Sequence, residues 1–368
     1  MPRAAVVYEH GGPVEVVDVT LAPLGPHDVR VVIAASGVCH SDVAAQTGAL
    51  AFPTPIILGH EGAGTVAEVG SEVTEVVPGD RVALSAIISC GRCRPCVEGT
   101  PNLCEWGLPI IFSCRQPDGG LRAADPAGRD IHQFASLGTL AEEVIVPDVA
   151  TVKIPDDVSF EAAALVGCGV LTGVGAVLNR GKVEAGDTVA VIGCGGVGLN
   201  VVQAAAMVGA AAVIAVDRED AKLQLARELG ATDTVDARSA DVVAAVRDLT
   251  GGRGVDFAFE CVGSGALVRQ AWDAVTISGT VVAIGVAAGD DVVTLPAQEL
   301  STSEKTLMSC LYGSSRPRLD MARYLQLYRQ GKLRLDELVT RRYPLDDVAS
   351  AVADLHSSRN ARGVVVMG

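Results

Sequence analysis

The feature that most constrains the fold of this chain is an uncharged run of 29 residues at positions 188–216. The run exceeds the roughly 20 apolar residues that a membrane-spanning helix requires. Four glycines interrupt it near its start, however, and the polar residues Asn200 and Gln203 follow them. The run therefore predicts a buried strand, a glycine turn, a helix and a second buried strand.

The alternation of strands and helices extends beyond this run. Apolar segments such as VDFAFEC and GTVVAIG alternate with helical segments such as EDAKLQLARELG. Parallel strands joined by helical crossovers form a doubly wound sheet. Residues before 155 instead contain short Val-rich segments separated by Gly and Pro, which is typical of antiparallel strands. We expect an α/β protein in which a Rossmann domain at 170–311 is inserted into a β-rich domain at 1–169 and 312–368.

The glycine turn has the context of a dinucleotide-binding site. It consists of Gly193, Cys194, Gly195, Gly196, Val197 and Gly198. It follows a strand, opens a helix, and lies 19 residues before the acidic Asp217 at the end of the next strand. Its glycines would permit a tight bend, close approach of a pyrophosphate and close helix packing. The N–H groups at the start of the helix would bind the phosphates.

The acidic residue indicates which dinucleotide is bound. Asp217 can accept hydrogen bonds from ribose hydroxyls, and its charge would repel a 2′-phosphate. The pattern therefore favours NAD over NADP. The alternative is a packing turn in an α/β domain that binds no cofactor.

Four cysteines lie close together in a loop that contains several glycines and prolines. They are Cys90, Cys93, Cys96 and Cys104. Four thiolates at this spacing can bind one Zn²⁺ tetrahedrally and leave no open position for a substrate. The ion would stabilise a loop that has little apolar core of its own. A disulfide pair or an iron–sulfur cluster is the alternative use of these cysteines.

A second possible ligand set is dispersed along the chain. Cys39 and His60 are 21 residues apart among strand segments, and Cys168 lies just before the Rossmann domain. Two thiolates and one imidazole are typical ligands of catalytic zinc, whose fourth position is left for water or substrate. Spacing alone does not join Cys168 to the other two, and each residue alone could equally be a buried packing residue. The other cysteines are assigned to packing: Cys114, Cys194, Cys261 and Cys310.

The charge balance excludes some partners. The chain has 29 basic and 44 acidic residues, a net charge of −15, whereas nucleic acids and anionic membranes bind basic surfaces. Hydrophobic residues make up 49% and charged residues 20%, which excludes intrinsic disorder. The N-terminal segment MPRAAVVYEHGG has no apolar run of signal-peptide length. We expect a soluble, cytoplasmic protein that binds neither nucleic acid nor membrane.

Together these motifs resemble the zinc-containing medium-chain alcohol dehydrogenase family. The segments GVCHSD, PIILGHEGAG, VGCGVLTGVGAV, VIGCGGVGL and AVD occur in order, and the resemblance covers essentially the whole chain. It implies a GroES-like β-rich catalytic domain with two zinc ions, in addition to the Rossmann domain. The catalytic zinc would be bound by Cys39, His60 and Cys168. The structural zinc would be bound by Cys90, Cys93, Cys96 and Cys104.

The resemblance also implies the reaction and the roles of neighbouring residues. The reaction is hydride transfer between NAD and a primary or secondary alcohol, aryl or bulky alcohols included, which gives an aldehyde or ketone. Ser41 would accept the substrate proton, Asp42 would orient His60, and Glu61 would be a carboxylate that can approach the metal. The residues expected near the cofactor are Thr172 at the nicotinamide, Lys222 and Arg362 at the ribose and pyrophosphate, and His40 near the phosphates.

Two positions depart from the family pattern, and two alternative functions stay open. Ala44 stands where a histidine often ends the proton relay, so water or another group must release the proton. Ala86 stands where an aromatic residue is frequent, which suggests a roomier pocket. The long loop at 105–140 is similar to that of the dimeric classes that include glutathione-dependent formaldehyde dehydrogenase, so we expect a homodimer, with a tetramer as the alternative. A thiol-dependent formaldehyde dehydrogenase and a non-catalytic cofactor-binding sensor or scaffold are the alternative functions.

Overall fold

The computed structural model describes residues 1–356 and 361–368 of the chain, which divides into two compact units. Unit 1 consists of Met1–Cys168, Arg316–Gly331 and Leu335–Gly368. Unit 2 consists of Gly169–Ser315 and Lys332–Arg334. The sequence predicts domain boundaries after residues 169 and 311. Residues 357–360 of the predicted β-rich domain lie outside the described residues.

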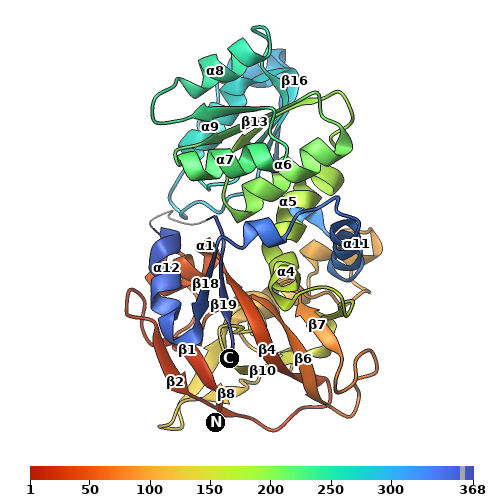
Figure 1. Ribbon diagram of the computed structural model, residues 1–368, viewed down its shortest axis with the longest axis vertical. Coiled ribbons are helices and arrows are strands. Elements are labelled where there is room, and N and C mark those ends of the chain that lie inside the picture. Colours follow the sequence, from red (N-terminus) through yellow and green to blue (C-terminus); the bar gives the residue numbers. More distant parts are fainter. Residues whose placement is uncertain (357–360) are drawn as a thin grey trace. The chain divides into compact units, whose positions relative to one another are not determined.

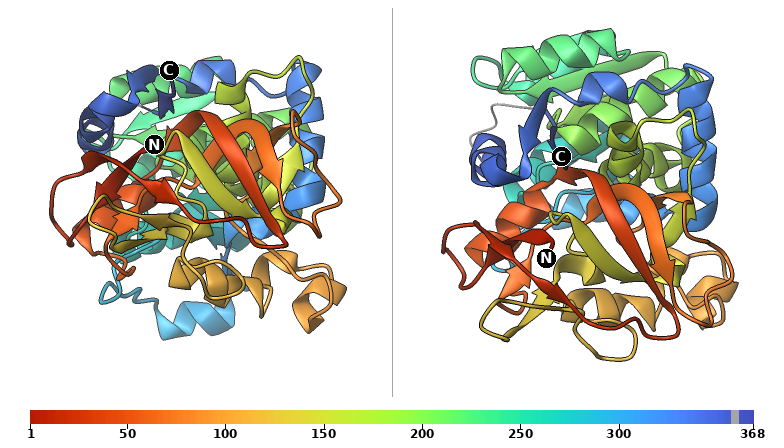
Figure 2. Two further views of the ribbon diagram at one scale, coloured as in Figure 1. Left: turned by 90° about the horizontal axis from the view of Figure 1, so that it is seen from below. Right: turned by 60° about the horizontal axis from the view of Figure 1, so that its bottom comes forward.

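Unit 1 is built on two mostly antiparallel sheets (Figures 1 and 2). The first sheet contains β1 (Arg3–Val7), β2 (Glu15–Asp18), β3 (Thr20–Leu21), β5 (Ile56–Ile57), β8 (Ala123–Ala124) and β9 (Asp130–Gln133). The second contains β4 (Asp28–Val38), β6 (Glu61–Val69), β7 (Arg81–Leu84), β10 (Glu143–Pro147), β11 (Thr151–Lys153), β18 (Arg341–Pro344) and β19 (Gly363–Val366). The α-helices are α1 (His40–Thr47), α2 (Arg94–Val97), α3 (Gly107–Ser113), α4 (Phe160–Leu165), α11 (Pro317–Arg329) and α12 (Val348–His356).

The long strand β4 organises the second sheet. Its sequence DVRVVIAASGV is rich in β-branched residues, and most of its side chains are buried. β4 pairs antiparallel with β6 along one edge. Along its other edge it pairs antiparallel with β10 near its start and with β19 near its end. Aliphatic side chains from β1, β4, β19 and α12 form one core of this unit.

Unit 2 contains one fully parallel sheet with the strand order β14-β13-β12-β15-β16-β17, which is the doubly wound order of a Rossmann fold. Its strands are β12 (Thr188–Ile192), β13 (Ala212–Asp217), β14 (Asp233–Asp236), β15 (Val255–Glu260), β16 (Val275–Ala283) and β17 (Thr306–Ser309). Its α-helices are α5 (Leu171–Gly175), α6 (Gly196–Val208), α7 (Asp220–Glu228), α8 (Val242–Leu249), α9 (Gly265–Ala274) and α10 (Ala297–Thr302), and several lie along the sheet in Figure 1. The predicted strand, turn, helix and strand at 188–216 are confirmed.

One helical stretch has the length and composition of a membrane span. It covers Phe160–Gly181, with π-helical turns at Val166–Val170 and Ala176–Gly181. Of its most apolar window, 83% is buried within the protein. Its apolar character is therefore that of a core helix.

Candidate active site

The strand pairing of unit 1 brings Cys39 and His60 to one edge of a sheet. β4 ends at Val38 and β6 begins at Glu61, and their antiparallel register pairs Gly37 with Glu61. Cys39 then becomes the N-cap of α1, and both it and His60 are buried. Two residues that are distant in the sequence are therefore neighbours in space.

Asp42, in the first turn of α1, holds both of these residues. Its Oδ2 accepts a hydrogen bond from the Cys39 N–H at 2.8 Å, and its Oδ1 accepts one from the Gly59 N–H at 2.9 Å. The same Oδ1 lies 3.3 Å from His60 Nδ1. Burial opposes a charged imidazole, but the Asp42 carboxylate raises the pKa of His60 well above its usual value. His60 Nε2 is buried and has no hydrogen-bond partner among the described residues, as expected of a nitrogen placed to bind a metal.

Cys168 reaches the same place from another part of unit 1. It lies in the π-helical turn after α4, and α4 packs against β4 and β6. Four residues each offer one ligand atom within 4.8 Å of the others: Cys39, His60, Glu61 and Cys168. The structure thus brings together the three residues that spacing alone could not join.

This donor set fits zinc. Thiolates and imidazole are the ligands that Zn²⁺ prefers, and three protein ligands leave a position for substrate. The hydrogen bond from Cys168 is the largest cause of a Cys39 pKa that lies well below its usual value. The same hydrogen bond is the largest cause of a raised pKa at Cys168, and a carboxylate stands behind the imidazole, as it commonly does at zinc sites.

A buried ion pair lies next to the donor set. Arg362 Nη2 donates to Glu61 Oε1 at 2.9 Å, and Arg362 Nη1 donates to the Val38 carbonyl oxygen at 3.1 Å. Both side chains are almost completely buried, and burial raises the pKa of Glu61 to about 7 although the guanidinium opposes the shift. The sequence does not predict that these two residues form an ion pair. The predicted contact of Arg362 with pyrophosphate stays a prediction.

Other predicted residues lie on the first turns of α1 and on α5. Ser41 is half-buried, and its Oγ lies 3.8 Å from Cys39 Sγ. His40 is exposed and Ala44 is half-buried. Thr172 is buried on α5 in unit 2. The structure therefore brings Ser41 to the donor set, whereas the contacts of His40 and Thr172 with a cofactor stay predictions.

The four-cysteine loop forms a second ligand set. The Sγ atoms within 4.8 Å of one another belong to Cys90, Cys93, Cys96 and Cys104. Cys93 Sγ lies 3.4 Å from Cys96 Sγ and 3.7 Å from Cys104 Sγ, far longer than the about 2.05 Å of a disulfide. Backbone N–H groups of Arg92 and Cys93 lower the pKa of Cys90 to about 6. The loop is therefore arranged to bind a metal through thiolates and forms no disulfide.

The glycine turn of unit 2 is shaped to receive a phosphate. Gly193 has φ +92°, and a Cβ at Gly198 would collide with the Gly193 carbonyl oxygen, so both positions require glycine. A Cβ at Gly195 would meet no atom within 4 Å, which leaves the backbone open on that side. α6 begins directly after Gly195 and directs its N-terminal N–H groups to this opening. The shape of the turn therefore leaves room for a pyrophosphate, and the binding of a dinucleotide there stays a prediction.

The Asp217 carboxylate is held beside this turn. Its Oδ2 accepts the Cys194 N–H at 2.7 Å, and its Oδ1 accepts the N–H groups of Arg218 at 2.7 Å and Glu219 at 3.0 Å. Lys222 lies on α7 and is buried. Three backbone donors fix the carboxylate, and Oδ2, which accepts only one of them, keeps a lone pair that can accept a ribose hydroxyl.

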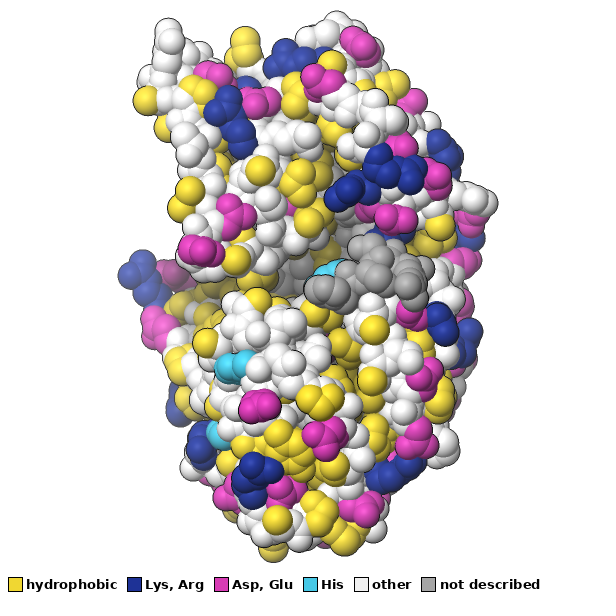
Figure 3. Space-filling model, turned by 90° about the vertical axis from the view of Figure 1, so that its left-hand side faces the viewer, with side chains coloured by type: hydrophobic (Ala, Val, Ile, Leu, Met, Phe, Trp, Pro, Cys, Tyr) yellow, Lys and Arg dark blue, Asp and Glu magenta, His cyan; other side chains and the backbone are white. Residues whose placement is uncertain are grey.

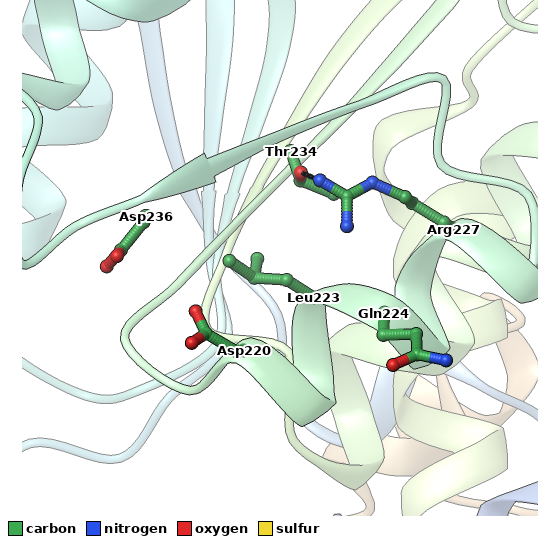
Figure 4. Close-up of a pocket in the computed structure, with 6 residues that line it drawn as sticks. All are labelled: Asp220, Leu223, Gln224, Arg227, Thr234 and Asp236. Carbon is green, nitrogen blue, oxygen red and sulfur yellow. Dashed lines mark hydrogen bonds between the residues drawn. The ribbon is translucent and has the colours of Figure 1, made fainter.

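A pocket of about 390 Å³ opens between α7 and β14 in unit 2 (Figure 4). Its lining consists of Asp220, Leu223, Gln224, Arg227, Thr234 and Asp236. Asp236 is paired with Asp217 in the β13–β14 register, and Arg238 binds both Asp236 and Asp220. The pocket therefore neighbours the predicted ribose end of the dinucleotide site and belongs to a different unit from the metal donors.

A row of aromatic rings, which sequence analysis missed, begins at the predicted zinc ligand His60. Phe134 packs edge-on against His60, with ring centroids 5.0 Å apart, and Phe52 packs edge-on against Phe134 at 4.9 Å. Phe112 stacks on Phe52 at 6.2 Å and is 57% exposed. These three phenylalanines, the aromatic row, come from separate segments without a shared sequence period, so no local pattern could have joined them.

Two family models match this chain, and relatives match it over nearly its full length. The family model for the alcohol dehydrogenase GroES-like domain matches residues 25–156, and that for zinc-binding dehydrogenase matches residues 196–330. The NDMA-dependent alcohol dehydrogenase of Amycolatopsis methanolica is 41% identical over 369 residues, which cover 99% of this chain and 98% of that relative. The S-(hydroxymethyl)glutathione dehydrogenase of Saccharomyces cerevisiae is 36% identical over 370 residues, which cover 98% of this chain and 95% of that relative.

The architecture also has a solved counterpart. The crystal structure of benzyl alcohol dehydrogenase from Acinetobacter calcoaceticus has a TM-score of 0.92 and 31% sequence identity, and the match covers 100% of this chain and 99% of that chain. The predicted fold class, a GroES-like β-rich domain with a Rossmann domain, is confirmed. The similarity extends over nearly the full length, and this chain belongs to the zinc-containing medium-chain alcohol dehydrogenase family.

Proposed function

We propose that this alcohol dehydrogenase uses NAD and a zinc ion to interconvert primary or secondary alcohols with aldehydes or ketones. The observation that carries the proposal is the convergence of Cys39, His60 and Cys168, whose ligand atoms lie within 4.8 Å of one another. When bound, zinc supplies a Lewis acid that lowers the pKa of the alcohol, and NAD supplies the hydride acceptor.

The protein's own residues would hold the donors and move the proton. Asp42 keeps His60 Nδ1 occupied, so that Nε2 is the nitrogen presented to the metal. Ser41 takes the substrate proton and passes it to water, because Ala44 offers no side-chain relay. Glu61, held by Arg362, is a carboxylate that can approach the metal.

The four-cysteine loop would hold a second, structural zinc. Four protein ligands close the coordination sphere, so this ion takes no part in the reaction. Two apolar residues of the loop face solvent, Val97 at 74% and Leu103 at 46% exposure. Metal binding would therefore supply much of the cohesion of this segment.

The glycine turn and Asp217 support NAD as the cofactor. The turn would bind the pyrophosphate, and Asp217 and Lys222 would bind the adenosine ribose. The negative charge of Asp217 disfavours a 2′-phosphate. Because one relative is named as NDMA-dependent, NDMA is the alternative acceptor to be compared with NAD and NADP.

The aromatic row favours an aryl alcohol as substrate. Aromatic rings pack well edge-to-face or stacked, and this row extends from His60 to the exposed Phe112. Ala86, where the family often has an aromatic residue, is buried, and its small side chain is consistent with a larger substrate group. One similar solved structure is a benzyl alcohol dehydrogenase.

A second candidate is the oxidation of the hydroxymethyl adduct of a thiol. The relative from Saccharomyces cerevisiae, at 36% identity, is an S-(hydroxymethyl)glutathione dehydrogenase. Such a substrate also presents a primary hydroxyl, so the same zinc and NAD sites would serve it. The two candidates therefore differ only in the group next to the reacting alcohol.

Other features support a homodimer in the cytoplasm as part of this proposal. Edge strand β17 of unit 2 and the segment before it expose Val292, Leu300 and Leu307, a surface that would pair with a second copy in a homodimer. All ten cysteines are free thiols, which suits the cytoplasm. On the face shown in Figure 3, Lys and Arg side chains are scattered among Asp and Glu, which suits a small-molecule substrate better than nucleic acid.

One experiment tests the proposed function and separates its candidates. NADH formation is measured with benzyl and aliphatic alcohols, and with formaldehyde in the presence and absence of glutathione, alongside zinc analysis of the protein. Turnover of benzyl alcohol with NAD, with about two zinc ions per chain, supports the proposal. Turnover of formaldehyde only with thiol would favour the second candidate. With NDMA added as acceptor, its reduction by protein freed of bound nucleotide and given no NAD would overturn the cofactor assignment.

A further inference from the structure

A buried glutamate lies at the carboxyl end of the parallel sheet, next to the glycine turn. Glu260 is the last residue of β15, its side chain is 0% exposed, and it pairs with Ile192 of β12 in the strand register. Ile192 immediately precedes Gly193, the first glycine of the turn. Glu260 therefore stands one strand away from the point at which the proposed dinucleotide site begins.

The side chain of Glu260 folds back over the turn that follows it. Its Oε1 accepts hydrogen bonds from the N–H groups of Val262 and Gly263, both at 2.8 Å. The Glu260 carbonyl oxygen accepts the N–H groups of Ile284 at 2.9 Å and Gly285 at 3.1 Å. One residue thus fixes the turns after both β15 and β16.

The turn after β15 packs closely against its neighbours on one side, although Val262 is 55% exposed. Gly263 has φ +94°, and a Cβ there would lie 2.5 Å from the Val286 carbonyl oxygen. A Cβ at Gly193 would lie 2.5 Å from Val262 Cγ2, so this valine packs directly against the first glycine of the turn. The position of Val262 therefore limits the position of the glycine turn.

Burial of this carboxyl group lowers the stability of the protein. We infer that the position requires a side chain long enough to accept from the N–H groups of the turn. Glu260 Oε2 is buried and has no hydrogen-bond partner among the described residues. Burial raises the pKa of Glu260, although the backbone N–H donors oppose the shift. An unpartnered buried polar atom lowers stability, and a shorter acid could not extend as far over the turn.

We propose that Glu260 is a positioning residue of the dinucleotide site. Glu260 holds Val262 against Gly193 and so keeps the glycine turn in the conformation that binds NAD. This inference rests on the proposed NAD site. Glu260 acts through the turn and needs no contact with the cofactor.

Three variants separate reach from charge. Glu260→Gln keeps the acceptor oxygen and the chain length but removes the charge, Glu260→Asp keeps the charge but shortens the chain, and Glu260→Ala removes both. The control is Asp241→Ala, which removes the acceptor of the Ala244 N–H at the N-terminus of α8 in the same unit. For each protein, the NADH dissociation constant is measured by fluorescence titration, together with kcat, the KM for NAD, zinc content and thermal unfolding.

A positioning role predicts a defined pattern. Glu260→Gln and Asp241→Ala bind NADH within about twofold of the original chain, whereas Glu260→Asp and Glu260→Ala bind it about tenfold more weakly, as expected for lost hydrogen bonds. In the two weak binders the KM for NAD rises by a similar factor, while kcat at saturating NAD and zinc content change little.

Other results overturn the inference. If Glu260→Asp and Glu260→Ala unfold at lower temperature but bind NADH like the original chain, Glu260 is only a structural residue. If Glu260→Gln loses as much affinity as Glu260→Asp, the charge is required as well as the reach, and positioning by the acceptor oxygen alone is wrong. Should Glu260→Ala fail to fold, the comparison of the Asp and Gln variants decides. A failure of the original chain itself to bind NADH would instead remove the proposed cofactor site, and this inference with it.

Discussion

The two metal-ligand sets of this chain are assembled in opposite ways. The four-cysteine set comes from one short loop, residues 90–104, and three of its four cysteines are only half-buried. The other set joins Cys39, His60 and Cys168 from three distant segments; Cys39 and His60 are buried and are held by Asp42, and Cys168 is half-buried. The first set therefore needs little of the fold around it, whereas the second exists only when β4, β6 and the helical segment after α4 are in place.

This difference predicts that the two metal-ligand sets have different roles. A closed set of four ligands in a loop with little apolar core supplies stability to that loop. An open set of three ligands, with its histidine fixed by a carboxylate and an ion pair next to it, is arranged for chemistry. Substitutions in the two sets should accordingly change different measured quantities.

The largest effect is expected from Cys39→Ser. Loss of one thiolate from the open set should lower alcohol turnover by at least about a thousandfold and reduce zinc from about two ions per chain to about one. Cys114→Ser, at another buried cysteine, is the matched control and should keep both ions. Unchanged zinc content and turnover in Cys39→Ser would show that this set is not the catalytic centre.

Ser41→Ala should have the next largest effect. Removal of the hydroxyl that takes the substrate proton should lower kcat about a hundredfold, while the NADH dissociation constant stays the same. Thr47→Ala removes a hydroxyl from the last turn of the same helix and should leave kcat unchanged. An equal loss of NADH affinity and kcat in Ser41→Ala would argue against a relay role.

Asp42→Asn tests the support behind the histidine. Cys39 and Gly59 donate N–H groups to the two carboxylate oxygens of Asp42, and an amide NH₂ in place of one oxygen cannot accept such a hydrogen bond. The side chain is then no longer held in place, so His60 should lose its fixed orientation. The affinity of the open set for zinc, measured by competition with a chelator, should fall about 10- to 100-fold. The four-cysteine set should keep its ion, and equal loss of both ions would contradict the division between the sets.

Asp217→Gly tests the proposed cofactor site in unit 2. Loss of the ribose acceptor should weaken NAD binding about tenfold and improve the use of NADP relative to NAD, with no change in zinc content. Steady-state kinetics with both cofactors provide the measurement. Retained preference for NAD by the variant would show that another residue selects the cofactor.

The smallest effect on turnover is expected from Cys93→Ser. This chain should lose one zinc ion and unfold at a lower temperature, with early proteolytic cleavage between residues 90 and 104. At low temperature its kcat should stay within about twofold of the original value, because the open set is intact. A fall in kcat as large as that of Cys39→Ser would remove the distinction between the two sets.

Prediction from the sequence was most successful where contacts are local. The glycine turn was predicted with its strand and helix because Gly193, Gly198 and Asp217 have fixed spacings within one strand–helix–strand unit. The four-cysteine set was likewise predicted from spacing. The position of Cys168 was implied only by family resemblance, since a π-helical turn in a distant segment has no signal in local spacing.

Other parts of the site carried no usable sequence signal. The aromatic row draws Phe52, Phe112 and Phe134 from three separate segments. The ion pair of Glu61 with Arg362 joins residues from β6 and from the segment before β19, which meet only because both strands flank β4. Contacts of this kind depend on strand register, which is set by packing of the whole sheet and not by neighbouring residues.

The sequence by itself determined the α/β class, the glycine turn and the four-cysteine loop, because residues a few positions apart are held together by the chain whatever the rest of the fold does. Only the tertiary structure decided which of the buried groups meet: Cys168 with Cys39 and His60, Arg362 with Glu61, and Glu260 with the turn beside Gly193. These contacts exist because antiparallel and parallel strands bring distant segments to a common edge, and no spacing in the chain encodes that edge.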